Sequence, residues 1–185
     1  MANGTLKVSN IQTSSGSGTI TLGQSGETLA LGSGVTSKFN QPAFEAHITS
    51  NQTIDDNTIT KAQFDTKDFD TNNAYDNSTN YRFTPQVAGK YFIYAQLELA
   101  CTSNQIEYVQ FFIYKNGSIV RKFIEDPNDD TEKILPLYNS MVLDLNGSTD
   151  YVEIFGRIAR GSGTCHFTGD ASERPSFFGA YRLGA

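Results

Sequence analysis

Residues 83–99, Phe-Thr-Pro-Gln-Val-Ala-Gly-Lys-Tyr-Phe-Ile-Tyr-Ala-Gln-Leu-Glu-Leu, decide the fold of this chain. Side chains of an extended strand alternate between its two faces, so the odd-numbered residues from Tyr91 to Leu99 share one wholly apolar face. The other face places Phe92 and Tyr94 among polar residues and is too apolar to lie comfortably in water. The pattern predicts a central strand whose inner face packs in a core and whose outer face meets another surface.

The same stretch contains the motif Phe-x5-Gly-x-Tyr-aromatic-apolar, at Phe83, Gly89, Tyr91, Phe92 and Ile93. This motif resembles the central signature of the globular head of complement component 1q and, more loosely, of tumour-necrosis-factor-like jelly rolls. Further segments follow in that family's order: 42–46, 75–79, 115–117, 145–147, 151–154 and 176–183. The resemblance spans about residues 42 to 183 and implies a ten-stranded jelly roll that assembles as a trimer.

The rest of the chain after residue 41 is patterned as strands and turns, without a sustained helical period. Lys115-Asn-Gly-Ser118 predicts a type I′ hairpin, and Leu145-Asn-Gly-Ser148 has the same chemistry. Residues 65–80 and 125–132 are expected to be long polar loops. The predicted fold is all-β: an antiparallel ten-stranded jelly-roll sandwich at 42–185, trimeric, with an extended N-terminal β arm at 1–41. The ten expected strands are 42–49, 58–66, 80–84, 90–101, 106–115, 118–125, 134–144, 150–160, 163–168 and 175–183.

Residues 1–41 differ in composition from the remainder, being rich in Gly, Ser and Thr with no aromatic residue before Phe39. Such a composition is typical of a flexible linker. Short alternations of Thr with apolar residues instead favour strands that pair with other chains. This pattern resembles the N-terminal segments of tailed-phage virion proteins, and we interpret it as an anchoring arm. The candidate anchoring residues are Leu6, Val8, Ile20, Leu22, Leu29 and Leu31.

The two cysteines, Cys101 and Cys165, are expected to be free thiols. If 90–101 and 151–160 are neighbouring antiparallel strands, Cys101 and Cys165 lie near opposite ends of the sandwich. A disulfide requires Cα atoms within about 7 Å. Free thiols would fit assembly in a reducing compartment.

Charge and targeting signals limit the partners. The net charge is −6 and the pI is about 4.8, which argues against a nucleic-acid partner. The first residues contain no apolar signal sequence, and no window has the 18 apolar residues of a membrane span. These features predict a protein made in a host cytoplasm and located in a virion.

No motif for catalysis or cofactor binding is present, so an enzyme is not expected. The neighbours Cys165 and His166 would point to opposite faces of a strand and could not form a catalytic dyad. Acidic loops could ligate Ca²⁺, although they lack the spacing of a known calcium loop. The candidate carboxylates are Asp126, Asp129 and Asp130 in one loop and Asp65, Asp68 and Asp70 in the other.

Aromatic residues beyond what one core needs are interpreted as part of a subunit interface. The predicted function is a non-enzymatic homotrimeric structural protein of a tailed bacteriophage, a fibre, knob or capsid decoration docked to other virion proteins by its arm. The alternative is a secreted trimeric adhesin module that binds a host receptor or glycan. The candidate interface residues are Phe92, Tyr94, Phe111, Ile113, Tyr151 and Tyr181.

Overall fold

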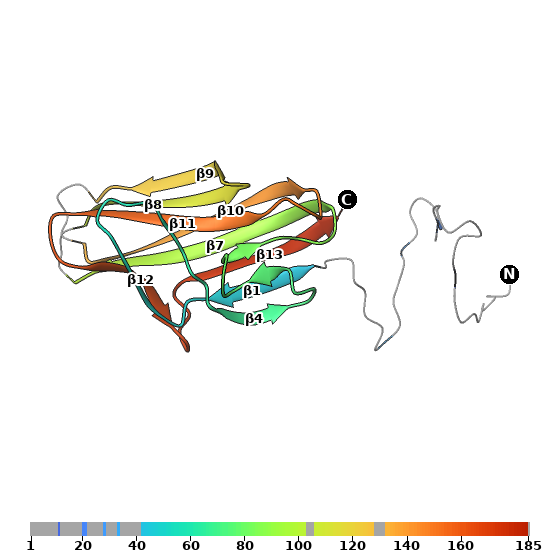
Figure 1. The fold of residues 1–185 in the computed structure, drawn as a ribbon, viewed down its shortest axis with the longest axis horizontal. Coiled ribbons are helices and arrows are strands. Elements are labelled where there is room, and N and C mark those ends of the chain that lie inside the picture. The colour runs from blue at the N-terminus through green and yellow to red at the C-terminus, as the bar shows by residue number, and fades with distance from the viewer. Residues whose placement is uncertain are drawn as a thin grey trace. The chain divides into compact units, whose positions relative to one another are not determined.

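The computed structural model describes residues 42–102, 106–127 and 132–184, and before them residues 11, 20, 21, 28 and 33. The chain divides into two units, Met1–Ser37 and Lys38–Ala185. The described elements are all β-strands of the second unit, and they form two antiparallel sheets (Figure 1). Within the described ranges, no helix is long and apolar enough to cross a membrane.

The first sheet, sheet A, is built around the stretch with the signature motif. That stretch is β7 (Gly89–Cys101), whose one edge pairs along its length with β10 (Ile134–Leu145). Its other edge pairs first with β13 (Phe177–Gly184) and then with β12 (Cys165–Asp170). The sheet continues through β1 (Ala43–His47) to β4 (Thr66–Asp70) beyond β13, and ends at β2 (Ser50–Ile54) beyond β12.

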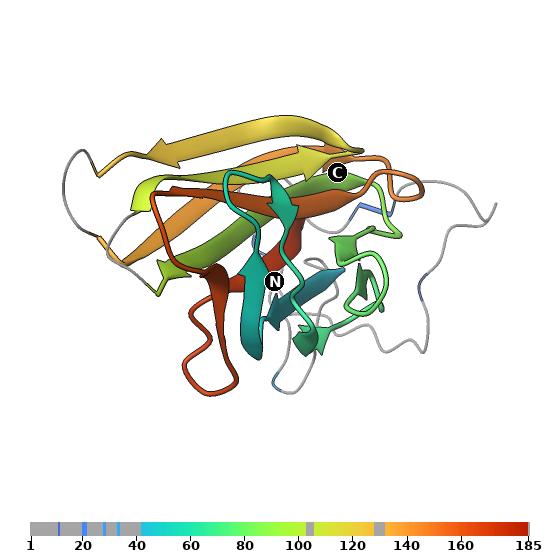
Figure 2. The ribbon, with the colours of Figure 1, turned by 60° about the vertical axis from the view of Figure 1, so that its left-hand side comes forward.

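The second sheet, sheet B, has an uncovered edge strand. Its order is β5 (Tyr75–Asp76), β6 (Arg82–Phe83), β11 (Val152–Arg160), β8 (Ile106–Lys115) and β9 (Ser118–Glu125), and β3 (Thr60–Lys61) also pairs with β11. β9 therefore pairs with β8 on one side only, and it forms the margin of the sheet in Figure 2.

The core lies between the sheets and is rich in aromatic rings. The inner face of β7 has zero exposure at Tyr91 and at every second residue to Leu99, as the alternation predicts. Phe44 of β1 stacks on Tyr75 and Phe83 with ring centroids 4.6 and 4.7 Å apart, which joins sheet A to sheet B. Signature residue Phe83 is thus a contact between the sheets as well as part of a motif.

One of the two predicted Asn-Gly hairpins is confirmed. Asn116 and Gly117 have φ values of 52° and 76°, the left-handed conformation that a type I′ turn requires, and they join β8 to β9. The second prediction is wrong, because residues 146–151 carry the chain from β10 in sheet A to β11 in sheet B. Asn146 Oδ1 accepts the backbone N–H groups of residues 148–150 and closes this crossover loop.

The prediction of a polar loop at 65–80 is also wrong. That segment contains β4, which extends sheet A by pairing with β1, and β5, which pairs with β6. Its polar residues close the turns between these strands, as when Asp70 accepts the N–H groups of Ala74 and Tyr75. The described part of the chain therefore holds thirteen strands, where ten were expected.

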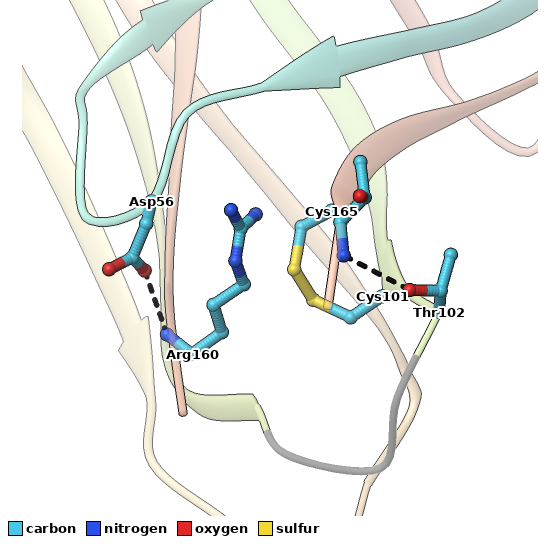
Figure 3. The surroundings of a disulfide bond; sticks show 6 residues. Asp56, Cys101, Thr102, Arg160 and Cys165 are labelled. Atoms are coloured by element: carbon cyan, nitrogen blue, oxygen red, sulfur yellow. Dashed lines mark hydrogen bonds between the residues drawn. A yellow bond between two sulfur atoms is a disulfide. The ribbon is translucent and has the colours of Figure 1, made fainter. Parts of the chain in front are cut away.

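The prediction of free thiols is wrong as well. Cys101 and Cys165 are directly paired residues of β7 and β12 with Cα atoms 4.0 Å apart, and they form a disulfide (Figure 3). The error lay in the strand order, because β11 pairs with β8 and not with β7. Arg160, the last residue of β11, pairs with Ile106, the first residue of β8. Five residues later, Cys165 of β12 pairs with Cys101, the last residue of β7, so the two cysteines lie at the same end of the sandwich.

Candidate subunit interface

The outer face of sheet A carries a cluster of aromatic side chains on neighbouring strands. Phe92 of β7 stacks with Tyr94 at 6.1 Å between ring centroids and contacts Tyr181 of β13 at 5.5 Å. Tyr94 contacts Tyr181 and Phe177 at 6.4 Å each. All four side chains remain partly exposed, and we call them the aromatic face.

Tyr94 is held in place by a carboxylate and a glycine. Its hydroxyl donates to Glu45 Oε2 of β1 at 2.8 Å, reaching across β13 to do so. The ring lies directly over Gly179, where any Cβ would overlap it. Burial, followed by the hydrogen bond to Glu45, raises the pKa of Tyr94 well above its ordinary value, so the phenol stays neutral at physiological pH.

A further apolar surface adjoins the aromatic face, along the neighbouring edges of the two sheets. Every residue of β9 is exposed, including Phe123 at 42% and Ile124 at 48%. β10, the edge strand of sheet A, exposes Tyr138 and Val142 at 53% and 50%, and both lie on the outer face of that sheet because Val142 pairs with Phe92 and Tyr138 with Gln96. Sequence analysis missed this surface, which we call the β9–β10 edge. The signal was the strand 118–125, whose apolar residues fall on both faces.

The structure separates the six predicted interface residues into three groups. Phe92, Tyr94 and Tyr181 lie together in the aromatic face, and their role in assembly stays a prediction. Phe111 and Ile113 have zero exposure in the core, so they are not available to a second chain. Tyr151 precedes β11 in sheet B, where its ring supports Arg82 at 4.5 Å, and does not belong to the aromatic face.

The predicted anchoring residues remain untested. Leu6, Val8, Leu22, Leu29 and Leu31 lie outside the described residues. Ile20 is described, and its side chain is 41% exposed.

The carboxylates proposed for calcium in the loop after β3 are used within the fold. Asp65 accepts from the N–H and hydroxyl of Thr49, and Asp68 accepts from His47 and Arg174. Asp70 caps the turn before β5. Among the described residues, no three His, Cys, Asp or Glu side chains are grouped to hold a metal ion. Asp129 and Asp130 lie outside those residues, while Asp126 is described.

The histidines have structural surroundings. His47 is buried, and its Nδ1 is 3.0 Å from Asp68 Oδ2. Cys165, next to His166, forms the disulfide with Cys101 and therefore has no free thiol to act as a nucleophile. Burial lowers the pKa of His166, which favours its neutral form.

Comparison with solved structures bears directly on the fold. The chain is similar to the globular domain of zebrafish complement 1qA, at 16% identity and a TM-score of 0.55, over 77% of this chain and 98% of that one. The chain has the complement-1q and TNF-like jelly-roll fold. It is also similar to Eiger TNF from S. frugiperda, at 11% identity and a TM-score of 0.55, over 77% of this chain and 93% of that one.

Murine APRIL gives a comparable match, at 12% identity and a TM-score of 0.54, over 76% of this chain and 98% of the other. No protein-family model matches this chain. No curated protein matches its sequence either. The predicted resemblance is therefore confirmed at the level of fold, with identities too low to transfer a function.

Proposed function

We propose that this chain is a homotrimeric, non-enzymatic head, in which the aromatic face of one subunit packs against the β9–β10 edge of the next. The observation that carries this proposal is the location of the exposed apolar side chains. Partly exposed rings gather on the outer face of sheet A, and exposed apolar side chains gather on the adjoining strands β9 and β10. Apolar patches of this kind mark interaction sites.

The two surfaces differ in composition, which determines the kind of symmetry. The aromatic face presents four rings around the Tyr94–Glu45 hydrogen bond, with Tyr138 and Val142 of β10 beside them, whereas β9 presents branched aliphatic side chains with Phe123. A contact between unlike surfaces is heterologous, and repeated around an axis it closes a ring. The fold resemblance favours a ring of three.

Two variants and their mixture test this arrangement. Tyr94→Lys disables the face, and Phe123→Asp disables the edge, so each variant alone should be monomeric in native mass spectrometry. Mixing them leaves one intact face and one intact edge, which should give a 1:1 dimer that cannot grow. Ile59→Asp is the matched control, because Ile59 is 40% exposed but lies outside both surfaces and should leave the trimer intact.

Other outcomes would contradict the proposal. If Phe123→Asp alone forms a dimer through its face, the contact is between like surfaces. If both variants remain trimers, neither surface is the interface.

We further propose that the assembled head is a structural component of a phage virion, with residues 1–41 docking it to other virion proteins. The Thr and apolar alternation in that segment supports this role, since short strands of this kind need another chain to complete their pairing. Deleting residues 1–36 should leave a folded trimeric head that is absent from assembled particles. Incorporation of the truncated head at the full-length level would contradict the docking role.

One observation favours the alternative, a secreted adhesin module. Disulfides persist mainly in oxidising compartments, and Cys101 is bonded to Cys165. Neighbouring genes separate the two proposals: portal and terminase genes support the virion, and secretion genes support the adhesin.

A further inference from the structure

A polar cavity lies where sheet B begins, beside β5 and β6. Its volume is about 380 Å³, within the range of small-molecule sites. None of the residues that line the cavity belongs to the aromatic face or to the β9–β10 edge, so it has no part in the proposed assembly. Most of its lining consists of amide and hydroxyl side chains: Asn73, Asn77, Ser78, Asn80, Thr84 and Gln86.

Most charged groups that line the cavity are already paired. The Lys67 ammonium donates to Asp70, to Asn73 Oδ1 and to the carbonyl of Tyr75. Asp76 accepts the backbone N–H groups of residues 78–80 and the side-chain amide of Asn80. These donors hold the pKa of Asp76 well below its ordinary value, so it remains ionised and occupied as a loop cap.

Arg82 is different. It is directly opposite Asp76 in the β5–β6 pair, yet Asp76 is turned to its own loop. Among the described residues, no oxygen accepts a hydrogen bond from the Arg82 guanidinium, and no carboxylate pairs with it. It is the cation in the cavity wall whose N–H groups remain available to a ligand.

The Arg82 guanidinium stacks on an aromatic ring, which limits its movement. The guanidinium carbon lies 4.5 Å from the centroid of the Tyr151 ring, as in a cation–π pair. Tyr151 is anchored through its backbone, because its N–H donates to Asn116 Oδ1 and its carbonyl accepts the Asn116 N–H. A stacked guanidinium loses little freedom on binding, and its fork matches a carboxylate in bidentate geometry.

We propose that this cavity binds a single acidic sugar unit, with the sugar carboxylate on Arg82. The amide oxygens of Asn77 and Gln86 take no hydrogen bond from the described residues, and they can accept from sugar hydroxyls. Because few apolar side chains line the cavity, it suits a polyol and not an apolar ligand. The site does not depend on trimer formation or on the location of the protein.

The experiment is calorimetric titration of the full chain with sodium glucuronate, sodium N-acetylneuraminate, neutral glucose and sodium sulfate. At least one acidic sugar should bind with a Kd of about 1 mM, a weak affinity that calorimetry can measure. Glucose and sulfate should bind at least tenfold more weakly. Arg82→Gln should abolish binding, and Arg82→Lys should weaken it at least tenfold, because an ammonium keeps the charge but loses the fork.

Lys133→Gln is the matched control, because it removes one positive charge from an exposed residue beside Cys101, at the opposite end of β7. It should bind the sugar as the unmodified chain does. Circular dichroism of each variant confirms that it is folded. The proposal is overturned if neither acidic sugar binds, if glucose or sulfate binds equally well, or if folded Arg82→Gln retains the affinity.

Discussion

The outer faces of the two sheets are both aromatic, but they are completed differently. On sheet B, cationic side chains of the same chain lie over the rings: Lys61 over Phe155 at 5.6 Å and Arg157 over Tyr108 at 5.4 Å. On the aromatic face of sheet A, the described rings contact one another and the Glu45 carboxylate, and no described cationic side chain stacks on them. Long cationic side chains of the same chain thus shield the outer rings of sheet B from solvent. The outer rings of sheet A have no such cover, and we expect them to pack against another subunit.

The largest expected effect, on assembly, comes from placing a cationic side chain beside the rings of sheet A, as on sheet B. Tyr181→Arg would place a guanidinium beside Phe92 and Tyr94, so the head should fold but assemble at least 100-fold more weakly. Tyr114→Arg makes the same change on sheet B, where Tyr114 packs on Phe155 at 4.3 Å. It should lower the melting temperature but leave assembly unchanged. Analytical ultracentrifugation measures both, and equal loss of assembly would contradict the comparison.

The disulfide provides the next largest effect, on stability alone. It joins residues 64 apart, so replacing both cysteines by serine should destabilise the head by about 4 kcal/mol in the chain-entropy estimate. Because both cysteines are buried and outside the aromatic face, the trimer should persist below the lowered melting temperature. In the unmodified protein, neither thiol should alkylate after denaturation without reductant. Alkylation of both would show that the bond is absent.

A single methyl group should have an intermediate effect. In Gly179→Ala the new Cβ would overlap the Tyr94 ring, and overpacking of this kind costs about 1–3 kcal/mol. Displacing Tyr94 should weaken assembly about tenfold or more, a value that corresponds to that cost. Gly184→Ala, on the same strand, is the control, because its Cβ would meet no atom within 4 Å. Equal behaviour of the two variants would show that the position of Tyr94 is unimportant.

The smallest effect concerns acid, which should act on both sheets. The hydroxyl of Ser172 and the N–H groups of Glu173 and Ser172 lower the pKa of Asp170, the last residue of β12, from 3.8 to about 2. Since this folded-state pKa lies below the unfolded one, the stabilisation is complete above about pH 4 and is lost as the pH falls through 2. Asp76 in sheet B is shifted in the same direction. Thermal melts should show that Asp170→Asn flattens this dependence, and an unchanged dependence would contradict the assignment.

Local patterns in the sequence predicted local structure well. The alternation in 91–99 identified the inner face of β7, and Asn116-Gly117 identified the hairpin, because both depend on neighbouring residues. The burial of Phe111 and Ile113 was not predicted, because residues 111–114 are apolar or aromatic on both faces and the period gives no choice between them. Which face of such a strand is buried depends on the elements that pack against it in the folded structure.

Contacts between distant segments account for the remaining errors. The disulfide was missed because the neighbours of β7 in the sheet are β10, β12 and β13, none of which the cysteine spacing identifies. The role of Tyr151 beneath Arg82 likewise joins residues 69 positions apart, and no sequence motif links them. The β9–β10 edge could have been noticed from the two-sided apolar pattern of 118–125.

The central claim, that sheet A is an assembly surface, is tested most directly by native mass spectrometry of the unmodified chain at micromolar concentration. We predict one dominant species with three times the 20.3 kDa mass of the chain. The Tyr94→Lys variant should be monomeric under the same conditions. A protein that is monomeric under these conditions would contradict the account.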